Sequence, residues 1–127
     1  MLKRIALFGE SERGKTGKGY YCDSLPQLMD SLGNPPHESR GLHFAIQALM
    51  FDFGLIYFPV AQEGFSHEDY EEGLEFLEKK ELLLETRALC LPGVGDKEII
   101  DIVTRLCHKH ANLLITNEGD LYDYLTA

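Results

Sequence analysis

The chain has 127 residues, of which 44% are hydrophobic and 10% aromatic, which excludes a disordered chain and fits one globular domain with its own core. Its 21 acidic and 12 basic residues leave a net charge of −9, which disfavours nucleic acid as a partner because binding to a phosphate backbone needs a basic surface. The three cysteines have no disulfide-framework spacing, and no apolar run fits a signal peptide or a membrane span, so we expect a cytoplasmic protein that does not associate with membranes.

Strand and helix patterns alternate along the first half of the chain. Residues 5–8 form an apolar run that predicts a short buried strand. After a glycine-rich loop, Ser24 predicts the N-cap of a short helix, and Gly33 marks its end. Residues 41–51 have the apolar period of a helix, and residues 55–60 predict a second strand.

The same alternation continues in the second half. Ser66, followed three residues later by Asp69, resembles a capping box and predicts the start of a helix with an acidic outer face. Residues 87–91 predict a third strand, and Asp96 predicts the N-cap of the most clearly amphipathic helix in the chain. Residues 113–116 predict a fourth strand, which an acidic turn and a terminal segment follow.

Short apolar strands that alternate with helices indicate right-handed crossovers and a parallel sheet covered on both faces. We therefore predict a single α/β domain over residues 1–127, with three layers, a Rossmann-like architecture and a mainly parallel sheet of about four strands. The first crossover is expected to contain two helices. A fifth strand, if present, is expected from the termini.

Acidic residues follow the predicted strands at their carboxyl ends. In a parallel sheet these ends share one edge, and α/β proteins bind ligands there. Carboxylate oxygens are typical ligands of Mg²⁺ or Mn²⁺, and a metal beside a phosphate is the usual apparatus of phosphodiester hydrolysis. The predicted metal ligands are Glu10, Asp96, Glu118 and Asp120, with Glu10, Asp96 and Asp120 as catalytic candidates. Glu63 also follows a strand, without an assigned role. The structural alternative is that turns are naturally acidic and that Asp96 serves only as a helix cap.

The segment GESERGKT directly follows the first predicted strand. Its spacing resembles the Walker A loop of P-loop nucleotide hydrolases, in which backbone N–H groups and a lysine hold phosphates and a threonine hydroxyl binds Mg²⁺. This resemblance implies a ligand with phosphate groups, such as a nucleotide. The residues that would bind it are Gly9, Ser11, Gly14, Lys15 and Thr16. The alternative is a solvated glycine- and lysine-rich loop, because Gly17 and Gly19 occupy the place of the helix that follows a Walker A loop.

A second resemblance covers residues 96–121, which look like the last helix–strand unit of PIN-domain and PIN-like nucleases. Asp96 or Asp101 matches the acid of the family's helix, and Glu118 and Asp120 match the acids of its C-terminal turn. The resemblance implies a metal-dependent ribonuclease or an inactive relative of one. Two positions depart from the family: Glu10 stands where the first strand should end in Asp, and Glu118 stands where Asp is usual.

Three functions therefore stay open. The first is binding of a nucleotide or another phosphate ligand together with Mg²⁺ at the carboxyl edge, and the second is the PIN-like nuclease. The third is a protein-interaction module without chemistry, in which the acidic helix over residues 66–78 meets a basic partner. The terminal Tyr122, Tyr124 and Leu125 are expected to dock on the sheet or on a partner subunit, which would make the protein a homo-oligomer.

Overall fold

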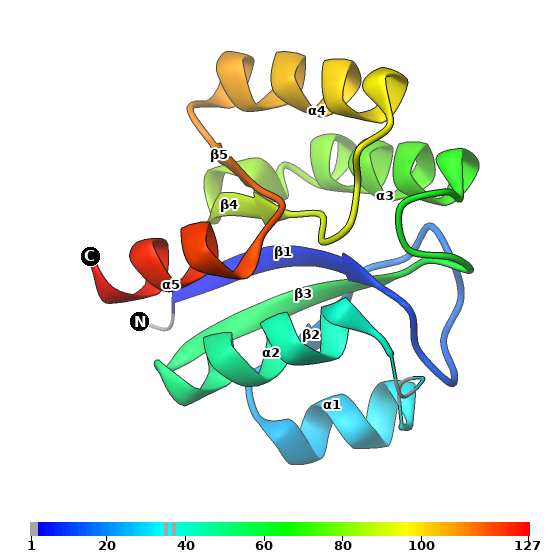
Figure 1. Cartoon of the computed structure of the whole chain (residues 1–127), viewed down its shortest axis with the longest axis vertical. Helices are drawn as coiled ribbons and strands as arrows, with labels where there is room; N and C mark the ends of the chain where they lie inside the picture. The colour runs from blue at the N-terminus through cyan, green and yellow to red at the C-terminus, as the bar shows by residue number, and fades with distance from the viewer. Residues whose placement is uncertain (1–2, 35, 37) are drawn as a thin grey trace.

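The computed structural model describes residues 3–34, 36 and 38–127. Within them the chain forms one sheet with helices on both faces (Figure 1). The elements in chain order are β1 (Lys3–Gly9), β2 (Tyr20–Cys22), α1 (Leu25–Leu32), α2 (Arg40–Met50), β3 (Phe53–Pro59), α3 (His67–Lys79), the 3-10 turn η1 (Leu82–Leu84), β4 (Thr86–Cys90), α4 (Lys97–His110), β5 (Leu113–Ile115) and α5 (Glu118–Thr126). None of the helices in the described residues is long and apolar enough to cross a membrane.

The sheet has the order β2-β3-β1-β4-β5. Strands β1, β3, β4 and β5 run parallel, and Leu7 in the centre lies between Tyr57 of β3 and Cys90 of β4. The prediction of a mainly parallel α/β sheet is therefore confirmed, including the two helices in the first crossover. The expected source of a fifth strand is wrong. That strand is β2, which lies inside the first crossover and pairs antiparallel with β3 at the edge of the sheet, with Cys22 opposite Leu55.

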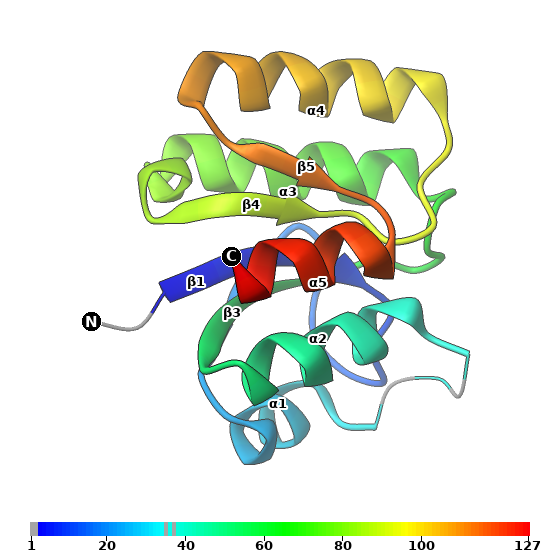
Figure 2. The same ribbon diagram turned by 60° about the vertical axis from the view of Figure 1, so that its left-hand side comes forward.

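Two hydrophobic layers enclose the sheet, which confirms the three-layer prediction. Along β1 the side chains of Ala6 and Phe8 face the layer of α3 and α4, whereas Ile5 and Leu7 face the layer of α1, α2 and α5. Figure 2 shows these two groups of helices on opposite sides of the strands. In the first layer, the ring of Phe8 stacks on those of Phe58 and Tyr70 with centroid distances of 4.8 and 5.5 Å.

Two predicted N-caps are confirmed, and one predicted cap is wrong. The Ser24 hydroxyl accepts from the N–H of Gln27, and the Asp96 carboxylate caps α4. Helix α3 does begin after Ser66, but the Ser66 side chain makes no capping hydrogen bond to a described residue of the helix. The Ser66 hydroxyl instead accepts from the N–H of Gln62 at 2.8 Å, and Asp69 accepts from the N–H of Ala61 at 2.9 Å. Both side chains therefore fix the turn before the helix, because that turn has backbone donors without other partners.

The acidic turn predicted after β5 is the first turn of α5. Asn117 caps this helix by accepting from the N–H of Asp120 at 2.8 Å, so the chain continues as a helix where the sequence analysis places a turn. Leu121 and Leu125 are buried in the layer of α1 and α2, whereas Tyr122 is 52% exposed. Of the three residues expected to dock, Leu125 and Tyr124 therefore pack against this layer, as part of a helix, and Tyr122 does not.

Candidate functional site

The carboxyl ends of the parallel strands lie at one edge of the sheet, on the right-hand side of Figure 1. Helices α2, α3 and α4 begin at the same edge. The strand order reverses between β1 and β4, since the chain leaves β1 toward β3 and then crosses back to β4. Open α/β sheets bind their ligands at such a reversal, which makes the surrounding loops the candidate site.

Glu63, in the loop after β3, occupies the N-terminus of α2. Its carboxylate accepts four hydrogen bonds, three of them from backbone N–H groups, at distances between 2.8 and 3.1 Å. The donors are the N–H groups of Glu10, Arg40 and Gly41 and the hydroxyl of Ser39. A helix N-terminus favours a negative group, so this carboxylate neutralises the start of α2.

Glu10, a predicted metal ligand, binds the backbone of Glu63 and the side chain of Tyr57. Its carboxylate accepts from the N–H of Glu63 at 3.0 Å, and its carbonyl accepts from the Tyr57 hydroxyl at 2.7 Å. Burial, followed by the charge of Glu63, raises the pKa of Tyr57, which keeps this hydroxyl a donor. A Cβ built on Gly9 would lie 2.8 Å from the Cα of Gly41, so two glycines allow the start of α2 to approach β1.

The loop with the Walker A spacing caps the C-terminus of α1. The N–H groups of Glu12 and Arg13 donate to the carbonyl of Leu32 at 3.1 and 2.9 Å. The guanidinium of Arg13 donates to the carbonyls of Met29 and Asp30, both at 3.0 Å. The carbonyls of Asp30 and Leu32 are among those that the last turn of a helix leaves unpaired, whereas that of Met29 also accepts from the N–H of Gly33. The positive charge of Arg13 is favourable at this end of the helix.

The remaining ligand candidates in this loop also have other partners or point to solvent. The Ser11 hydroxyl donates to a carbonyl two residues further on at 2.6 Å, and the N–H of Lys15 donates to the Tyr20 hydroxyl at 2.8 Å. Gly14 has a φ of +106°, which favours glycine, and the Lys15 and Thr16 side chains are exposed. The chain then enters β2, so the helix that would direct a Walker A loop at a phosphate does not follow here.

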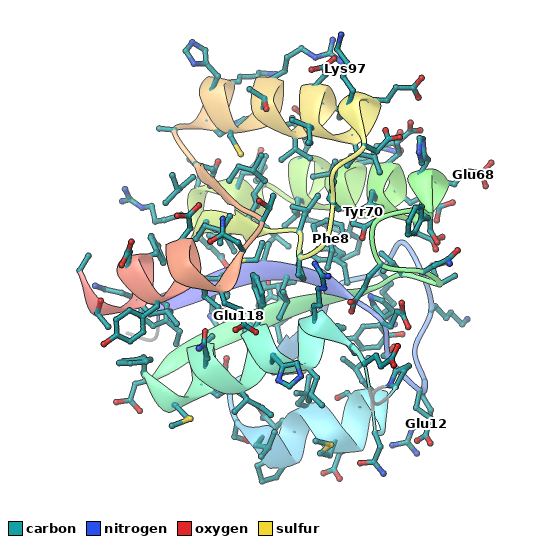
Figure 3. The ribbon with its side chains drawn as sticks, viewed as in Figure 1. Phe8, Glu12, Glu68, Tyr70, Lys97 and Glu118 are labelled. Carbon is teal, nitrogen blue, oxygen red and sulfur yellow. The ribbon has the colours of Figure 1, made fainter. Side chains whose placement is uncertain are left out.

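The four predicted metal ligands do not form one group. Among the residues that the structure describes, no three of them offer oxygens within 4.8 Å of one another. The Asp120 carboxylate accepts from the side-chain amide of Asn117 at 2.9 Å. Glu118 begins α5, well apart from the starts of α3 and α4, where Figure 3 shows Glu68 and Lys97.

Asp96 instead lies in a cluster with His67 and Glu98. Its Oδ1 caps α4 by accepting from the N–H groups of Glu98 and Ile99 at 2.9 and 3.2 Å. Its Oδ2 is 3.2 Å from Nε2 of His67, and Nδ1 of the same ring is 3.6 Å from Oε2 of Glu98. The sequence analysis missed His67 because it starts α3, a different element from the one that carries the two acids.

Arg40, the first residue of α2, is a second residue that the sequence analysis missed. A Cβ built on Gly93 would lie 3.5 Å from its Nη1, so the guanidinium lies over the turn between β4 and α4. In the part of the chain that the structure describes, no carboxylate lies within 4.0 Å of this guanidinium, and the N–H groups of Gly93 and Gly95 donate no hydrogen bond. The side chain and both glycines are exposed.

The comparisons with known proteins identified no relative of this chain. The Walker A and PIN-like resemblances therefore stay predictions, and the function has to be inferred from the chain's own residues. No protein-family model, no curated protein and no solved structure matches this chain.

Proposed function

We propose that this domain binds a small ligand through a phosphate or a similar anionic group, at the turn between β4 and α4 beside Arg40. The observation that carries the proposal is the position of Arg40. In a chain of net charge −9 its guanidinium has no carboxylate within 4.0 Å among the described residues. Arg40 begins α2, whose first N–H groups the Glu63 carboxylate already neutralises. An ion pair among the described residues therefore does not account for an arginine at this position.

Besides the charged side chain of Arg40, an anion needs backbone N–H donors, and the turn beneath Arg40 supplies them. Gly93 and Gly95, in the turn before α4, are exposed residues whose N–H groups donate no hydrogen bond within the described part of the chain. A Cβ built on Gly95 would meet nothing within 4 Å, so a ligand has room to approach the backbone. A glycine-rich turn between a strand and a helix at the reversal of strand order is typical of phosphate sites in α/β proteins.

Glu63, like Asp96 at the start of α4, occupies a helix start that a ligand could otherwise use. Its carboxylate already accepts from the N–H groups of Arg40 and Gly41 at the start of α2. These main-chain donors of α2 are therefore used, while the Arg40 side chain has no hydrogen bond or ion pair to a described residue and can meet a ligand. The proposed activity is binding rather than hydrolysis, because the acids predicted for hydrolysis do not lie together in the described residues.

The proposal is tested by thermal unfolding with ADP, ATP or pyrophosphate, with and without Mg²⁺. A ligand at a hundred times its dissociation constant adds about 2.7 kcal/mol, which raises the melting temperature of a domain this size by roughly 10 °C. Arg40→Gln should weaken binding by about 10- to 100-fold, since a charge-assisted hydrogen bond contributes roughly 1.5–3 kcal/mol.

Lys15→Gln is the matched control, because it removes the same charge from the exposed loop with the Walker A spacing. We expect it to leave binding unchanged. Binding that Lys15→Gln abolishes and Arg40→Gln preserves would place the ligand in the opening loop instead. No shift with any of the three compounds would remove the proposal.

A further inference from the structure

We propose that His67, Asp96 and Glu98 form a binding site for one divalent transition-metal ion, between the starts of α3 and α4. One ligand atom from each side chain lies within 4.8 Å of the other two. This inference goes beyond the proposed function and does not rest on it, because all three residues can bind a metal without a phosphate ligand.

The separation of His67 and Asp96 is close to that of two ligand atoms around a small metal ion. Zinc–nitrogen and zinc–oxygen bonds of about 2.0–2.2 Å in a tetrahedral arrangement place neighbouring ligands roughly 3.3–3.6 Å apart. Nε2 of His67 and Oδ2 of Asp96 are 3.2 Å apart, whereas Oε2 of Glu98 is 3.6 Å from Nδ1, the other ring nitrogen, and only one of the two nitrogens can bind a given ion. The Glu98 side chain is 81% exposed, so it can adjust to whichever ring nitrogen binds the ion.

Hydrogen bonds hold the two less exposed ligands, Asp96 and His67, in place. Asp96 uses Oδ1 for the cap of α4, which fixes the carboxylate and leaves Oδ2 directed at His67. His67 is the first residue of α3, and the turn before it is fixed by Ser66 and Asp69. Such prior ordering lowers the entropy that a metal would otherwise have to overcome.

The kinds of ligand atoms decide which metals fit. An imidazole nitrogen suits Zn²⁺, Ni²⁺ or Cu²⁺, whereas Mg²⁺, Ca²⁺ and Mn²⁺ prefer oxygen ligands. Three protein ligands leave a position for water, and a hollow of about 340 Å³ lined by Ser66, His67, Glu68 and Asp69 adjoins the cluster. Figure 3 shows Glu68 at the start of α3, where it adds negative charge that favours a cation. Asp96 directly follows Gly95, so the ion would adjoin the proposed anion site.

The site is tested on the full chain, freed of metal by a chelator and without any phosphate compound. Calorimetric titration with Zn²⁺ and the visible absorption of added Co²⁺ measure affinity, stoichiometry and the ligand field. We expect one ion per chain, and we expect His67→Gln to weaken binding at least tenfold. Asp96→Asn should do the same while the helix stays capped, because Asn is as good an N-cap as Asp.

His110→Gln is the matched control. The ring of His110 lies 3.6 Å from a single carboxylate, that of Glu78, and belongs to no three-ligand group in the described residues. Full binding in His110→Gln together with its loss in His67→Gln and Asp96→Asn supports the site. The absence of any binding, or equal affinity in His67→Gln and the unsubstituted chain, overturns it. Binding of Mg²⁺ as tight as that of Zn²⁺ would overturn the role of the imidazole.

Discussion

Glu10 and Glu63 hold each other across the carboxyl edge of the sheet, although they are 53 positions apart in the chain. The N–H of Glu10 donates to Oε2 of Glu63 at 2.8 Å, and the N–H of Glu63 donates to Oε2 of Glu10 at 3.0 Å. These reciprocal bonds join the loops that follow the two central strands β1 and β3. Two carboxylates that the sequence places at a ligand-binding edge therefore serve first to build that edge.

Replacement of Glu63 should destabilise the protein more than any surface acid does. Glu63→Ala leaves three donors at the start of α2 and the N–H of Glu10 without their acceptor, and we expect a loss of about 2–3 kcal/mol. Glu63→Gln keeps one carbonyl oxygen for three of these donors, so it should lose only about 1 kcal/mol. Urea unfolding measures both values. Glu71→Ala, on the exposed face of α3, is the control and should stay within 0.5 kcal/mol. Equal stability of the Glu63→Ala and Glu71→Ala variants would show that the hydrogen bonds to Glu63 contribute nothing.

Two helical glycines should respond in opposite directions to alanine. A Cβ at Gly73 of α3 would press on the ring of Phe8 and lie 3.1 Å from Cδ2 of Phe58, so Gly73→Ala should cost about 1–3 kcal/mol through overpacking. A Cβ at Gly119 of α5 would meet only Oδ1 of Asn117 at 3.4 Å. Gly119→Ala should therefore stabilise by up to about 1 kcal/mol, the usual gain in helix propensity. Denaturant midpoints compare the pair, and a gain at position 73 would contradict the tight contact with β1.

The opening loop should behave as a helix cap in exchange experiments. Arg13→Ala removes two hydrogen bonds to the last carbonyls of α1, so amide exchange in residues 25–32 should become several-fold faster. Lys15→Ala should leave that exchange unchanged, because the Lys15 side chain is exposed and only its N–H is used. The two substituted positions are only two residues apart and each substitution removes one positive charge, so the pair is matched in charge and location. The same exchange rates in both would show that Arg13 does not hold α1.

Stability should fall when the pH is raised above about 9. Burial raises the pKa of Cys22 and of Cys107 to about 11, while in an unfolded chain a thiol ionises near pH 8.5–9. Between these values the unfolded state has lost protons that the folded state keeps, so the stabilising effect is complete below pH 8.5 and declines toward pH 11. Each thiol should contribute a loss of about 1.4 kcal/mol per pH unit in that window.

Urea midpoints at pH 7, 8, 9 and 10 measure this decline. Cys22→Ala is the informative variant, because it removes the contribution of one thiol. Its unfolding free energy should therefore fall less steeply with pH above pH 9. Cys90 is buried as well and its pKa is also raised, so a slope remains in this variant. Identical midpoints at pH 7 and pH 10 would show that the thiols ionise within the folded protein.

The secondary structure was largely readable from the sequence because its signals are local. The apolar period of residues 41–51, the cap at Asp96 and the short apolar strands all act within one helical turn or one strand. The predictions that were wrong concern polar residues that can form more than one local hydrogen bond. Ser66 and Asp69 resemble a capping box but bond to the preceding turn, and Asn117 converts an expected acidic turn into the start of α5. In each case the sequence shows which hydrogen-bond donors and acceptors are present, but it does not show which donor bonds to which acceptor.

The sequence by itself determined that the strands end at one edge and which acids follow them, because strand direction and crossover handedness follow from the alternation of elements. Only the tertiary structure decided that Glu63 fills the start of α2, that Arg40 lies over Gly93, and that Asp96 meets His67. Each of these pairs joins segments that are far apart in the chain. Their contacts depend on loop paths and side-chain directions that no local pattern specifies, and this is why the candidate site lies beside the predicted one.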